Sequence, residues 1–282
     1  MSCNAPALDR VFIEIGSLSI YWYGVIIAFG LFLGLYIATK ESNRLGLQKD
    51  LMTDLVVFAI PMSIIFARAY YVFFEWDRYA GPPWWDIFAV WEGGIAIHGA
   101  LIGAVLTAII YARIKNVSFW QLADIAAPSL ILGQAIGRWG NFINQEAHGG
   151  PISESVYNNF HTYLPDFIMN QMCIDGVMYH PTFLYESLWN ILVFVILLVL
   201  RHKNPLRGEV FLSYIMAYSA GRFFIEGMRT DSLYVPGTDI RMAQLISVVL
   251  IAAVVALIVY RRKSRKTRKR YDGRKRQKNK KK

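Results

Sequence analysis

The sequence predicts an all-α, polytopic integral membrane protein with about seven transmembrane helices. Hydrophobic residues make up 55% of the 282-residue chain, a high share for a water-soluble domain. Aromatic residues make up 15%, which suits a protein with aromatic belts at the membrane interfaces. Apolar stretches long enough to cross a bilayer recur along the chain.

The predicted spans follow a short lead, residues 1–17. The first span, 15–39, contains 25 residues without a charge. Several later spans are interrupted by a charged residue, and Pro61 predicts a kink in the second. Together they define a membrane domain of residues 1–260 with an outward-facing polar segment, 138–180. The seven predicted spans are 15–39, 55–74, 93–112, 118–137, 181–200, 210–226 and 242–260.

Lysine and arginine are unevenly distributed among the loops. The alternate segments are poor in lysine and arginine: Arg10 lies before span one, Arg78 after span two and Arg138 after span four. The last alternate segment, between spans six and seven, has Arg229 and Arg241 and is the weakest point of the pattern. Positively charged loops stay in the cytoplasm, so we expect the N-terminus outside and the C-terminus inside, a parity that seven spans satisfy. The loops after the first, third and fifth spans contain Lys40, Arg44, Lys49, Arg113, Lys115, Arg201, Lys203 and Arg207.

Residues 261–282 form a basic tail. They hold 15 of the 30 lysines and arginines and one acid, Asp272, which leaves 15 bases against 19 acids in residues 1–260. We expect this cytoplasmic tail to be disordered and attracted to anionic lipid. We expect no nucleic-acid partner, because the charge run has no folded domain around it.

Cysteine usage and the common catalytic motifs exclude several classes of protein. Cys3 and Cys173 are the only cysteines, so a zinc site or a disulfide framework is not expected, and a single disulfide is open but disfavoured. No metal or cofactor is predicted. The chain has no HExxH, P-loop, GxGxxG or GxSxG motif, which argues against a metalloprotease, an ATPase or a serine hydrolase.

Polar residues concentrate in one membrane half. The run 137–150 follows an apolar span and supplies a cation, carboxamides and a carboxylate between glycines. The predicted topology places polar residues of five spans at the same outer level, with Asp124 as the exception. Such groups usually face a bundle interior or a water-filled cavity, so we expect one outward-facing polar cavity. Its predicted members are Arg68, His98, Arg138, Glu186, Arg222 and Glu226.

Each candidate has a functional and a structural interpretation. His98 can act as a general base, or it can form a hydrogen bond between helices. Arg138 and Arg222 can grip a phosphate, or they can form buried salt bridges with Glu146, Glu186 or Glu226.

The remaining candidates are weighed in the same way. Asn141 and Asn144 can orient a ligand or cap a turn. Tyr23 can contact a headgroup, but a belt aromatic is favoured, and Arg68 is expected to be structural rather than a third phosphate contact. Three glycine pairs at i, i+4 spacing predict close helix packing: Gly30 with Gly34, Gly99 with Gly103, and Gly133 with Gly137.

Six motifs in order along nearly the whole chain complete the pattern. They are 21–24 (YWYG), 67–71 (ARAYY), 98–103 (HGALIG), 137–146 (GRWGNFINQE), 180–186 (HPTFLYE) and 221–229 (GRFFIEGMR). Together they resemble the bacterial phosphatidylglycerol–prolipoprotein diacylglyceryl transferase family. Ala100 stands where that family often has glycine, and the basic tail is outside the family pattern.

The resemblance implies a reaction at the bacterial plasma membrane, the first step of lipoprotein maturation. The diacylglyceryl group of phosphatidylglycerol moves to the lipobox cysteine thiol of a prolipoprotein signal peptide, and glycerol phosphate is released. His98 and Arg222 are then the expected catalytic residues, and residues 151–179 are a cap or a preprotein contact. The expected headgroup contacts are Arg138, Asn141, Asn144, Glu146 and Tyr23, supported by Arg68, Glu186, Glu226 and Arg229.

A transporter of anionic solutes is the alternative interpretation. It predicts polar groups through the full membrane depth or an inverted repeat. The sequence has neither: its polar residues stop at the outer half, and neither half of the chain resembles the other. The transferase interpretation is therefore favoured.

Overall fold

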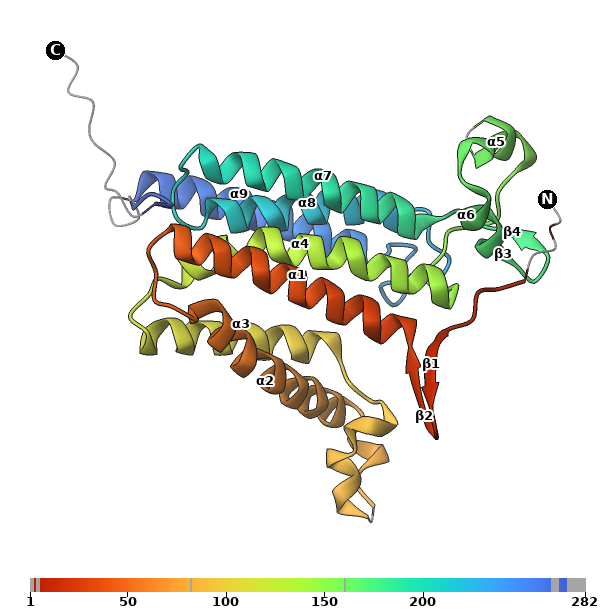
Figure 1. Cartoon of the computed structure of the whole chain (residues 1–282), viewed down its shortest axis with the longest axis horizontal. Helices are drawn as coiled ribbons and strands as arrows, with labels where there is room; N and C mark the ends of the chain where they lie inside the picture. The colour runs from red at the N-terminus through yellow and green to blue at the C-terminus, as the bar shows by residue number, and fades with distance from the viewer. Residues whose placement is uncertain (1–2, 4–5, 82, 160, 265–268, 273–282) are drawn as a thin grey trace. The chain divides into compact units, whose positions relative to one another are not determined.

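The computed structural model describes Cys3 and residues 6–81, 83–159, 161–264 and 269–272, and it is mostly helical (Figure 1). Most of the described residues belong to long helices that follow the apolar stretches of the sequence. The long helices are α1 (Trp22–Arg44), α2 (Leu51–Phe74), α3 (Ile97–Ile114), α4 (Phe119–Asn144), α7 (Thr182–His202), α8 (Glu209–Glu226) and α9 (Met242–Lys263).

Five of these helices are long and apolar enough to cross a membrane: α1, α2, α3, α7 and α9. The described helices α4 and α8 are equally long but more polar, and they do not meet the same criterion. A helical, multi-pass membrane protein is thus supported, while the count of seven spans and the orientation of the termini stay predictions.

Two short antiparallel hairpins accompany the helices, so the fold is not purely helical. One pairs β1 (Val11–Ile15) with β2 (Leu18–Tyr21), and the other pairs β3 (Cys173–Ile174) with β4 (Val177–Met178). The first hairpin corrects the predicted start of span one, because residues 15–21 are absent from α1. Gly16, with a φ of 63°, permits the tight turn that separates its two strands.

Short helical elements occupy the connections. The loop between α2 and α3 contains the 3-10 turns η1 (Trp76–Arg78), η2 (Trp84–Phe88) and η3 (Val90–Glu92). The connection from α4 to α7 contains α5 (Glu154–Asn159), η4 (His161–Tyr163) and α6 (Asp166–Gln171).

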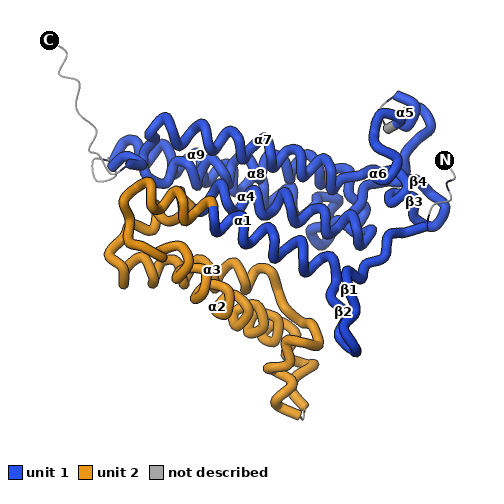
Figure 2. The backbone as a smooth tube through the Cα atoms, in the orientation of Figure 1, with its two compact units in different colours: residues 1–36, 126–282 blue, residues 37–125 orange. Residues whose placement is uncertain are grey.

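The chain divides into two compact units, which are described separately (Figure 2). Unit 2 comprises residues 37–125 and is built on the close pair α2 and α3. A Cβ atom on Gly99 would lie 2.3 Å from the carbonyl oxygen of Phe66, and one on Gly103 would lie 2.8 Å from that of Met62. The predicted close packing at these two glycines is confirmed, because any larger residue would push the helices apart.

Unit 1 comprises residues 1–36 and 126–282 and contains most of the helical bundle. Gly30 of α1 faces Gly133 of α4, where an added Cβ would lie 3.6 Å from the Cα of Gly133. Within this unit α7 lies beside α8, and α8 beside α9 (Figure 1). Gly221 of α8 accommodates the indole of Trp189, since a Cβ there would lie 2.2 Å from Nε1.

The segment between α4 and α7 folds over one end of the unit 1 bundle and has its own apolar core. The core packs against the ends of α4 and α7 through Phe142 and Phe183, whose ring centroids are 4.5 Å apart. Its other buried members are Ile152, Ile168, Met169, Met172, Cys173 and Met178.

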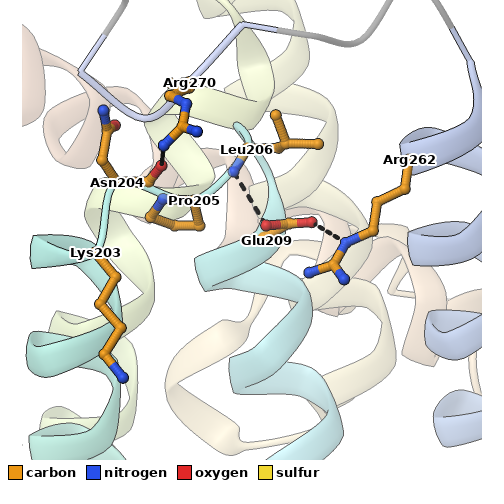
Figure 3. Close-up of a pocket in the computed structure, with 7 residues that line it drawn as sticks. All are labelled: Lys203, Asn204, Pro205, Leu206, Glu209, Arg262 and Arg270. Atoms are coloured by element: carbon orange, nitrogen blue, oxygen red, sulfur yellow. Dashed lines mark hydrogen bonds and ion pairs between the residues drawn. The ribbon is translucent and has the colours of Figure 1, made fainter. Parts of the chain in front are cut away.

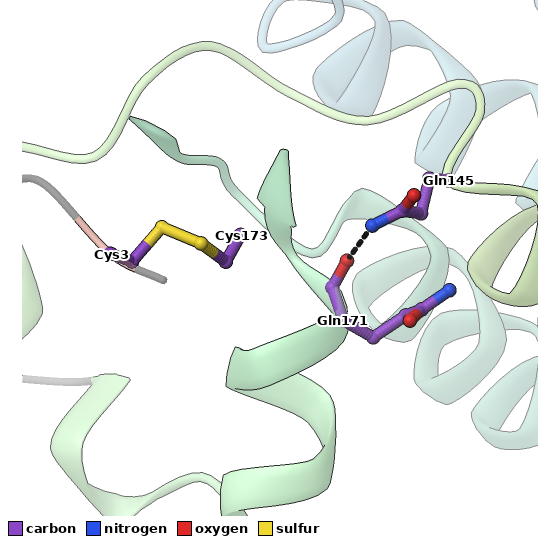
Figure 4. The surroundings of a disulfide bond; sticks show 4 residues. All are labelled: Cys3, Gln145, Gln171 and Cys173. Atoms are coloured by element: carbon purple, nitrogen blue, oxygen red, sulfur yellow. Dashed lines mark hydrogen bonds between the residues drawn. A yellow bond between two sulfur atoms is a disulfide. The ribbon is translucent and has the colours of Figure 1, made fainter. Parts of the chain in front are cut away.

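A disulfide joins this segment to the N-terminal lead, contrary to the expectation from the two distant cysteines (Figure 4). Cys3 and Cys173 are 170 residues apart in the sequence, so spacing alone gave no sign of the pairing. Beside it, buried Gln171 accepts the backbone N–H of Leu8 and donates to the carbonyls of Phe142 and Ile143. The lead, the segment between α4 and α7 (the cap segment, residues 151–179) and the end of α4 are thereby tied together.

The basic tail differs from the expectation where it is described. α9 continues to Lys263, and Leu206 forms an antiparallel bridge with Arg270. The backbone N–H of Tyr271 donates to the carbonyl of Pro205, and the Tyr271 side chain is 1% exposed. Part of the tail is therefore folded against the loop between α7 and α8. Residues 265–268 and 273–282, on which the expectation of disorder also falls, lie outside the described residues.

Candidate active site

Glu186 is the carboxylate around which the polar side chains of unit 1 gather. It lies in the second turn of α7, on a face buried at helical spacing, and is 4% exposed. Its neighbour Ser187 donates to the carbonyl of Ala135 at 3.0 Å and accepts from Nε1 of Trp139 at 3.2 Å. These bonds fix α7 against α4 and point the carboxylate at the last turns of α4.

Three arginines from three different segments pair with Glu186. Arg138, Arg222 and Arg229, together with Glu186, are called the arginine cluster. Nε of Arg138, on α4, contacts Oε2. Nη1 of Arg222, on α8, and Nη1 of Arg229, in the loop after α8, both lie 3.4 Å from Oε1. A buried carboxylate needs such partners, because a lone charge in this setting would be costly. The sequence placed Arg138, Glu186 and Arg222 at one level, and within unit 1 the structure brings both arginines into direct contact with Glu186.

The three arginines differ in how far their side chains remain accessible. Arg138 is 20% exposed and Arg222 is 22% exposed, whereas Arg229 is 9% exposed. Arg222 also pairs with Glu226 one turn later in α8, with Nη2 and Oε2 2.6 Å apart. Arg138 and Arg222 therefore keep accessible faces that an anionic ligand can approach, and Arg229 is more enclosed.

Arg229 is held by a forked ion pair. Its Nε and Nη2 donate to the two carboxylate oxygens of Asp231, at 2.9 and 2.6 Å. Burial alone would lower the pKa of Arg229, but the hydrogen bond and charge of Asp231, with nearby Glu186, raise it. The same hydrogen bond holds the pKa of the Asp231 carboxyl below its usual value. Both groups are charged at neutral pH, so Arg229 is well suited to supporting the cluster.

The end of α4 folds back on itself beside Arg138. The helix ends at Asn144, Gln145 adopts a left-handed conformation with φ 54°, and the N–H of Glu146 donates to the carbonyl of Asn141. Oε1 of Glu146 accepts from the amides of Asn141 at 2.9 Å and Asn144 at 3.4 Å. Arg138 in turn donates to Oδ1 of Asn141 at 3.4 Å. Glu146 is thus linked to Arg138 through Asn141 and not by a direct ion pair.

Backbone pairing closes the same end of unit 1. Gly149 donates to the carbonyl of His180, and Gly150 donates to that of Met228. A Cβ on Gly149 would lie 2.7 Å from the Cβ of His180, so glycine is required for this approach. Three segments that carry polar motifs of the chain, 137–150, 180–186 and 221–229, are therefore joined beside the arginine cluster.

Tyr23 contacts the same part of α4. It lies in the first turn of α1 and is 41% exposed. A Cβ on Gly140 would lie 2.6 Å from the Tyr23 ring, so the ring packs directly on the helix between Arg138 and Asn141. The phenol therefore lies near the predicted headgroup contacts, although it is also exposed in the way expected of a belt aromatic.

Arg68, in unit 2, has a structural environment. Its Nε donates to the carbonyl of Ile87 at 2.9 Å, and its Nη1 donates to those of Gly93 and Gly94 at 2.7 and 2.9 Å. Nη2 donates to the carbonyl of Asp86 at 2.5 Å, and the residue is 6% exposed. The guanidinium thus organises the loop between α2 and α3, which agrees with the structural interpretation of Arg68.

His98, also in unit 2, is the second residue of α3 and is exposed. Its ring centroid lies 6.1 Å from that of Tyr70. Within the described residues its ring forms no hydrogen bond that would support the interhelical alternative. The predicted convergence of His98 and Arg68 with the arginine cluster stays a prediction, as do the assigned roles.

Sequence reasoning missed several residues that shape the site. Asp231 was not proposed, although its position two residues after Arg229 was a usable signal. Arg241, whose Nη1 donates to the carbonyl of Glu226, entered only as an exception to the loop-charge pattern. Gln171 and the disulfide gave no local signal, because their partners are distant in the sequence.

Comparison with known proteins accounts for nearly the whole chain. Residues 10–260 match the sequence family described as prolipoprotein diacylglyceryl transferase (LGT). Three similar proteins carry the name phosphatidylglycerol–prolipoprotein diacylglyceryl transferase. That of Oceanobacillus iheyensis is 69% identical over 261 residues, covering 93% of this chain and 91% of the relative. Those of Geobacillus kaustophilus and Bacillus licheniformis are 58% identical over 262 residues (93% and 96% covered) and 57% identical over 271 residues (96% and 99% covered).

Proposed function

This chain belongs to the prolipoprotein diacylglyceryl transferase family, and from that premise we propose that it transfers diacylglyceryl from phosphatidylglycerol to prolipoproteins. The acceptor is the lipobox cysteine thiol that follows a signal helix. The reaction is the first step of bacterial lipoprotein maturation. The observation that carries the proposal is the family match over residues 10–260, together with identities of 69% and 58% to two proteins named for this activity.

The chemistry requires one bond to form and one to break. The cysteine sulfur forms a thioether bond with the carbon of the diacylated glycerol that bears the phosphate ester. The bond from that carbon to the phosphate oxygen breaks. Glycerol phosphate leaves with the bonding electrons. The thiol must lose its proton to attack, because the thiolate is the nucleophile. The enzyme therefore has to accept a proton and stabilise an anionic leaving group.

Arg138 and Arg222 are proposed to bind and stabilise the phosphate. Both share Glu186 and both remain partly exposed, at 20% and 22%. Negative charge grows on the leaving phosphate as the ester bond breaks, and guanidinium donors fixed beforehand stabilise that charge. Arg138 is proposed as the main headgroup contact and Arg222 as a catalytic residue. Glu186, Glu226 and Arg229 hold the two guanidinium groups in place.

His98 is proposed as the general base for the cysteine thiol. A neutral imidazole accepts a proton near neutral pH, and the exposed His98 ring has room for a substrate. Asn141, Asn144, Glu146 and Tyr23 are proposed to contact the glycerol and phosphate oxygens. Arg68 supports the loop between α2 and α3.

The membrane arrangement follows from the loop charges. We propose seven spans, including α4 and α8, with the N-terminus outside and the site in the outer half of the bacterial plasma membrane. Phosphatidylglycerol then reaches the site from the bilayer, and the preprotein cysteine reaches it just beyond its signal helix. The cap segment, 151–179, is placed to contact the preprotein, and the basic tail is attracted to anionic lipid.

The test is transfer of labelled diacylglyceryl from phosphatidylglycerol to a lipobox peptide by the purified protein. We expect the wild type to modify the thiol, and His98→Gln, Arg138→Gln and Arg222→Gln to lose most of the rate. His202→Gln and Arg44→Gln are matched controls. Among the described residues His202 bonds only to Leu198 of its own helix, and Arg44 forms an ion pair with Glu41, which is not a member of the cluster. A peptide thiol left unmodified by the wild type would refute the proposed transferase activity. A full rate in His98→Gln would refute that base.

A further inference from the structure

The end of unit 1 opposite the arginine cluster contains a cavity of about 290 Å³ lined by basic residues (Figure 3). It lies where α7 ends, α8 begins and α9 ends. Lys203, Arg262 and Arg270 give it three positive charges against the single acid Glu209. The remaining lining residues are Asn204, Pro205 and Leu206. This size is at the low end for ligand sites and suits a small polar group.

The folded part of the basic tail builds one wall of this cavity. Arg270 is fixed by its bridge to Leu206 and by the bond from Arg207 N–H to the carbonyl of Lys269. Nη1 of Arg270 donates to the carbonyl of Asn204 at 3.1 Å. The buried side chain of Tyr271 anchors residues 269–272 of the tail. The cavity is therefore preorganised and is not a chance gathering of mobile lysines.

The two arginines keep donors available. Glu209 is satisfied, because Oε2 accepts the N–H of Leu206 at 3.0 Å and Oε1 accepts Nε of Arg262 at 2.7 Å. Within the described residues, Arg262 uses only Nε, and Arg270 uses only Nη1. In this described part of the chain, the other two nitrogens of each guanidinium have no partner and can donate to a ligand. Guanidinium groups bind phosphate oxygens with paired, charge-assisted hydrogen bonds.

The location indicates the source of the phosphate. Lys203 follows Glu186 by 17 residues of chain that are mostly α7, so the cavity is roughly 25 Å along the helix from the cluster, close to a bilayer's hydrocarbon thickness. Apolar side chains on the last turns of α7 and α9, Val199 and Val259, are 53% and 46% exposed. A lipid with its headgroup in the cavity would find apolar surface for its chains beside it. Basic pockets at the ends of spans are known to hold anionic headgroups.

We propose that this cavity is a second phosphate-binding site, separate from the arginine cluster, that holds the headgroup of an anionic phospholipid at the opposite membrane surface. Arg270 and Arg262 grip the phosphate, and Lys203 adds charge at the rim. A bound lipid joins tail residues 269–272 to the ends of α7 and α9, and so it stabilises the folded part of the tail.

The experiment uses the full-length protein in an uncharged detergent. Short-chain phosphatidic acid is titrated while thermal unfolding is followed, with short-chain phosphatidylcholine as the neutral lipid. Phosphatidic acid is chosen because it lacks the headgroup glycerol that the residues beside the arginine cluster are proposed to contact in phosphatidylglycerol. We expect it to raise the Tm, and we expect Arg270→Gln to weaken its apparent affinity about tenfold, the loss of one charge-assisted donor group. Arg113→Gln is the matched control, an exposed arginine at the end of α3 that does not line the cavity.

Two further arms separate the alternatives. The Tm in sodium phosphate is compared with the Tm in sodium chloride at equal ionic strength. If phosphate gives an Arg270-dependent Tm increase that phosphatidic acid does not exceed, the cavity is assigned to free phosphate instead of a lipid headgroup. The titration in Arg138→Gln separates this site from the cluster, and the Arg270-dependent part is expected to persist there. Equal losses in Arg270→Gln and Arg113→Gln, or no loss in Arg270→Gln, would overturn the proposal.

Discussion

Arg68 in unit 2 and the pair Arg138 and Arg222 in unit 1 show two ways of keeping arginine inside a membrane protein. Arg68 directs all three guanidinium nitrogens at backbone carbonyls of one loop and is 6% exposed. Arg138 and Arg222 share the carboxylate of Glu186 and keep about a fifth of their side chains exposed. The first arrangement engages four of the five guanidinium N–H groups with fixed carbonyls, and the second leaves part of each guanidinium side chain accessible to a ligand.

The comparison shows how a structural arginine differs from an available one. A guanidinium satisfied by fixed carbonyls stabilises a local fold, since leaving buried groups unpaired is costly. A guanidinium that shares one carboxylate with two other guanidinium groups is only partly compensated by it, so a second anion can bind at its exposed side. Burial and charge alone do not separate these cases, but the identity of the acceptors does.

The largest effect is expected from the acid that the cluster shares. Glu186→Gln leaves the guanidinium groups of Arg138, Arg222 and Arg229 without their common partner, and breaking a buried ion pair typically costs about 3–5 kcal/mol. Denaturant unfolding in detergent measures the loss. Glu75→Gln is the control, because the pair of Glu75 and Arg78 is exposed and should contribute less than about 1 kcal/mol. Equal losses of unfolding free energy in Glu186→Gln and Glu75→Gln would contradict the special role given to the shared, buried carboxylate.

Removing an available arginine should affect catalysis most. Arg138→Gln and Arg222→Gln are each expected to lower the diacylglyceryl transfer rate about 10²–10³-fold, the usual effect of losing a donor that stabilises developing charge. The measurement is initial rate per folded protein with a lipobox peptide. A rate within threefold of wild type in Arg138→Gln would make its salt bridge to Glu186 purely structural.

Removing Arg68 should affect stability instead. Arg68→Gln leaves the carbonyls of Asp86, Ile87, Gly93 and Gly94 without their donor, and we expect a loss of about 1–3 kcal/mol. Hydrogen exchange should increase in the loop between α2 and α3 and should not increase in the cap segment. If exchange in that loop is unchanged, the role assigned to Arg68 is wrong.

The smallest effect concerns pH. The pKa of Asp231 is lowered in the folded protein by its hydrogen bond with Arg229, so its contribution to stability is present above the unfolded pKa of 3.8 and is lost as pH falls through the folded pKa. Because Asp231 is half exposed, the effect should be below about 1 kcal/mol. Melting from pH 6 to pH 2 should show a shallower loss in Asp231→Asn than in wild type. Asp239→Asn, in the same exposed loop, should follow wild type.

The long apolar stretches predicted the helices well, because a stretch of bilayer length leaves few alternatives for the backbone. The predicted span 242–260 starts where α9 starts, and the span 55–74 ends where α2 ends. The predictions were less successful at residues 15–21, where β2 and the turn at Gly16 replace the expected helix. The hairpin was hidden because its apolar residues resemble the start of a span.

The candidate site was predictable to the extent that its charges lie in helices. Glu186, Arg222 and Glu226 were placed at one level by topology, and the structure joins them. Glu146 was expected near an arginine, but the turn after α4 directs it to Asn141 and Asn144. Contacts between distant loops, such as the bond from the N–H of Gly150 to the carbonyl of Met228, depend on backbone turns that the sequence pattern does not specify.

The most direct test of the central claim is the equilibrium binding of phosphatidylglycerol to folded Arg138→Gln and Arg68→Gln, measured beside the wild type. If the acceptors around an arginine determine whether it is available, Arg138→Gln should raise the Kd about tenfold or more, and Arg68→Gln should leave it unchanged. An unchanged Kd in Arg138→Gln, or an equal increase in both variants, would contradict the claim.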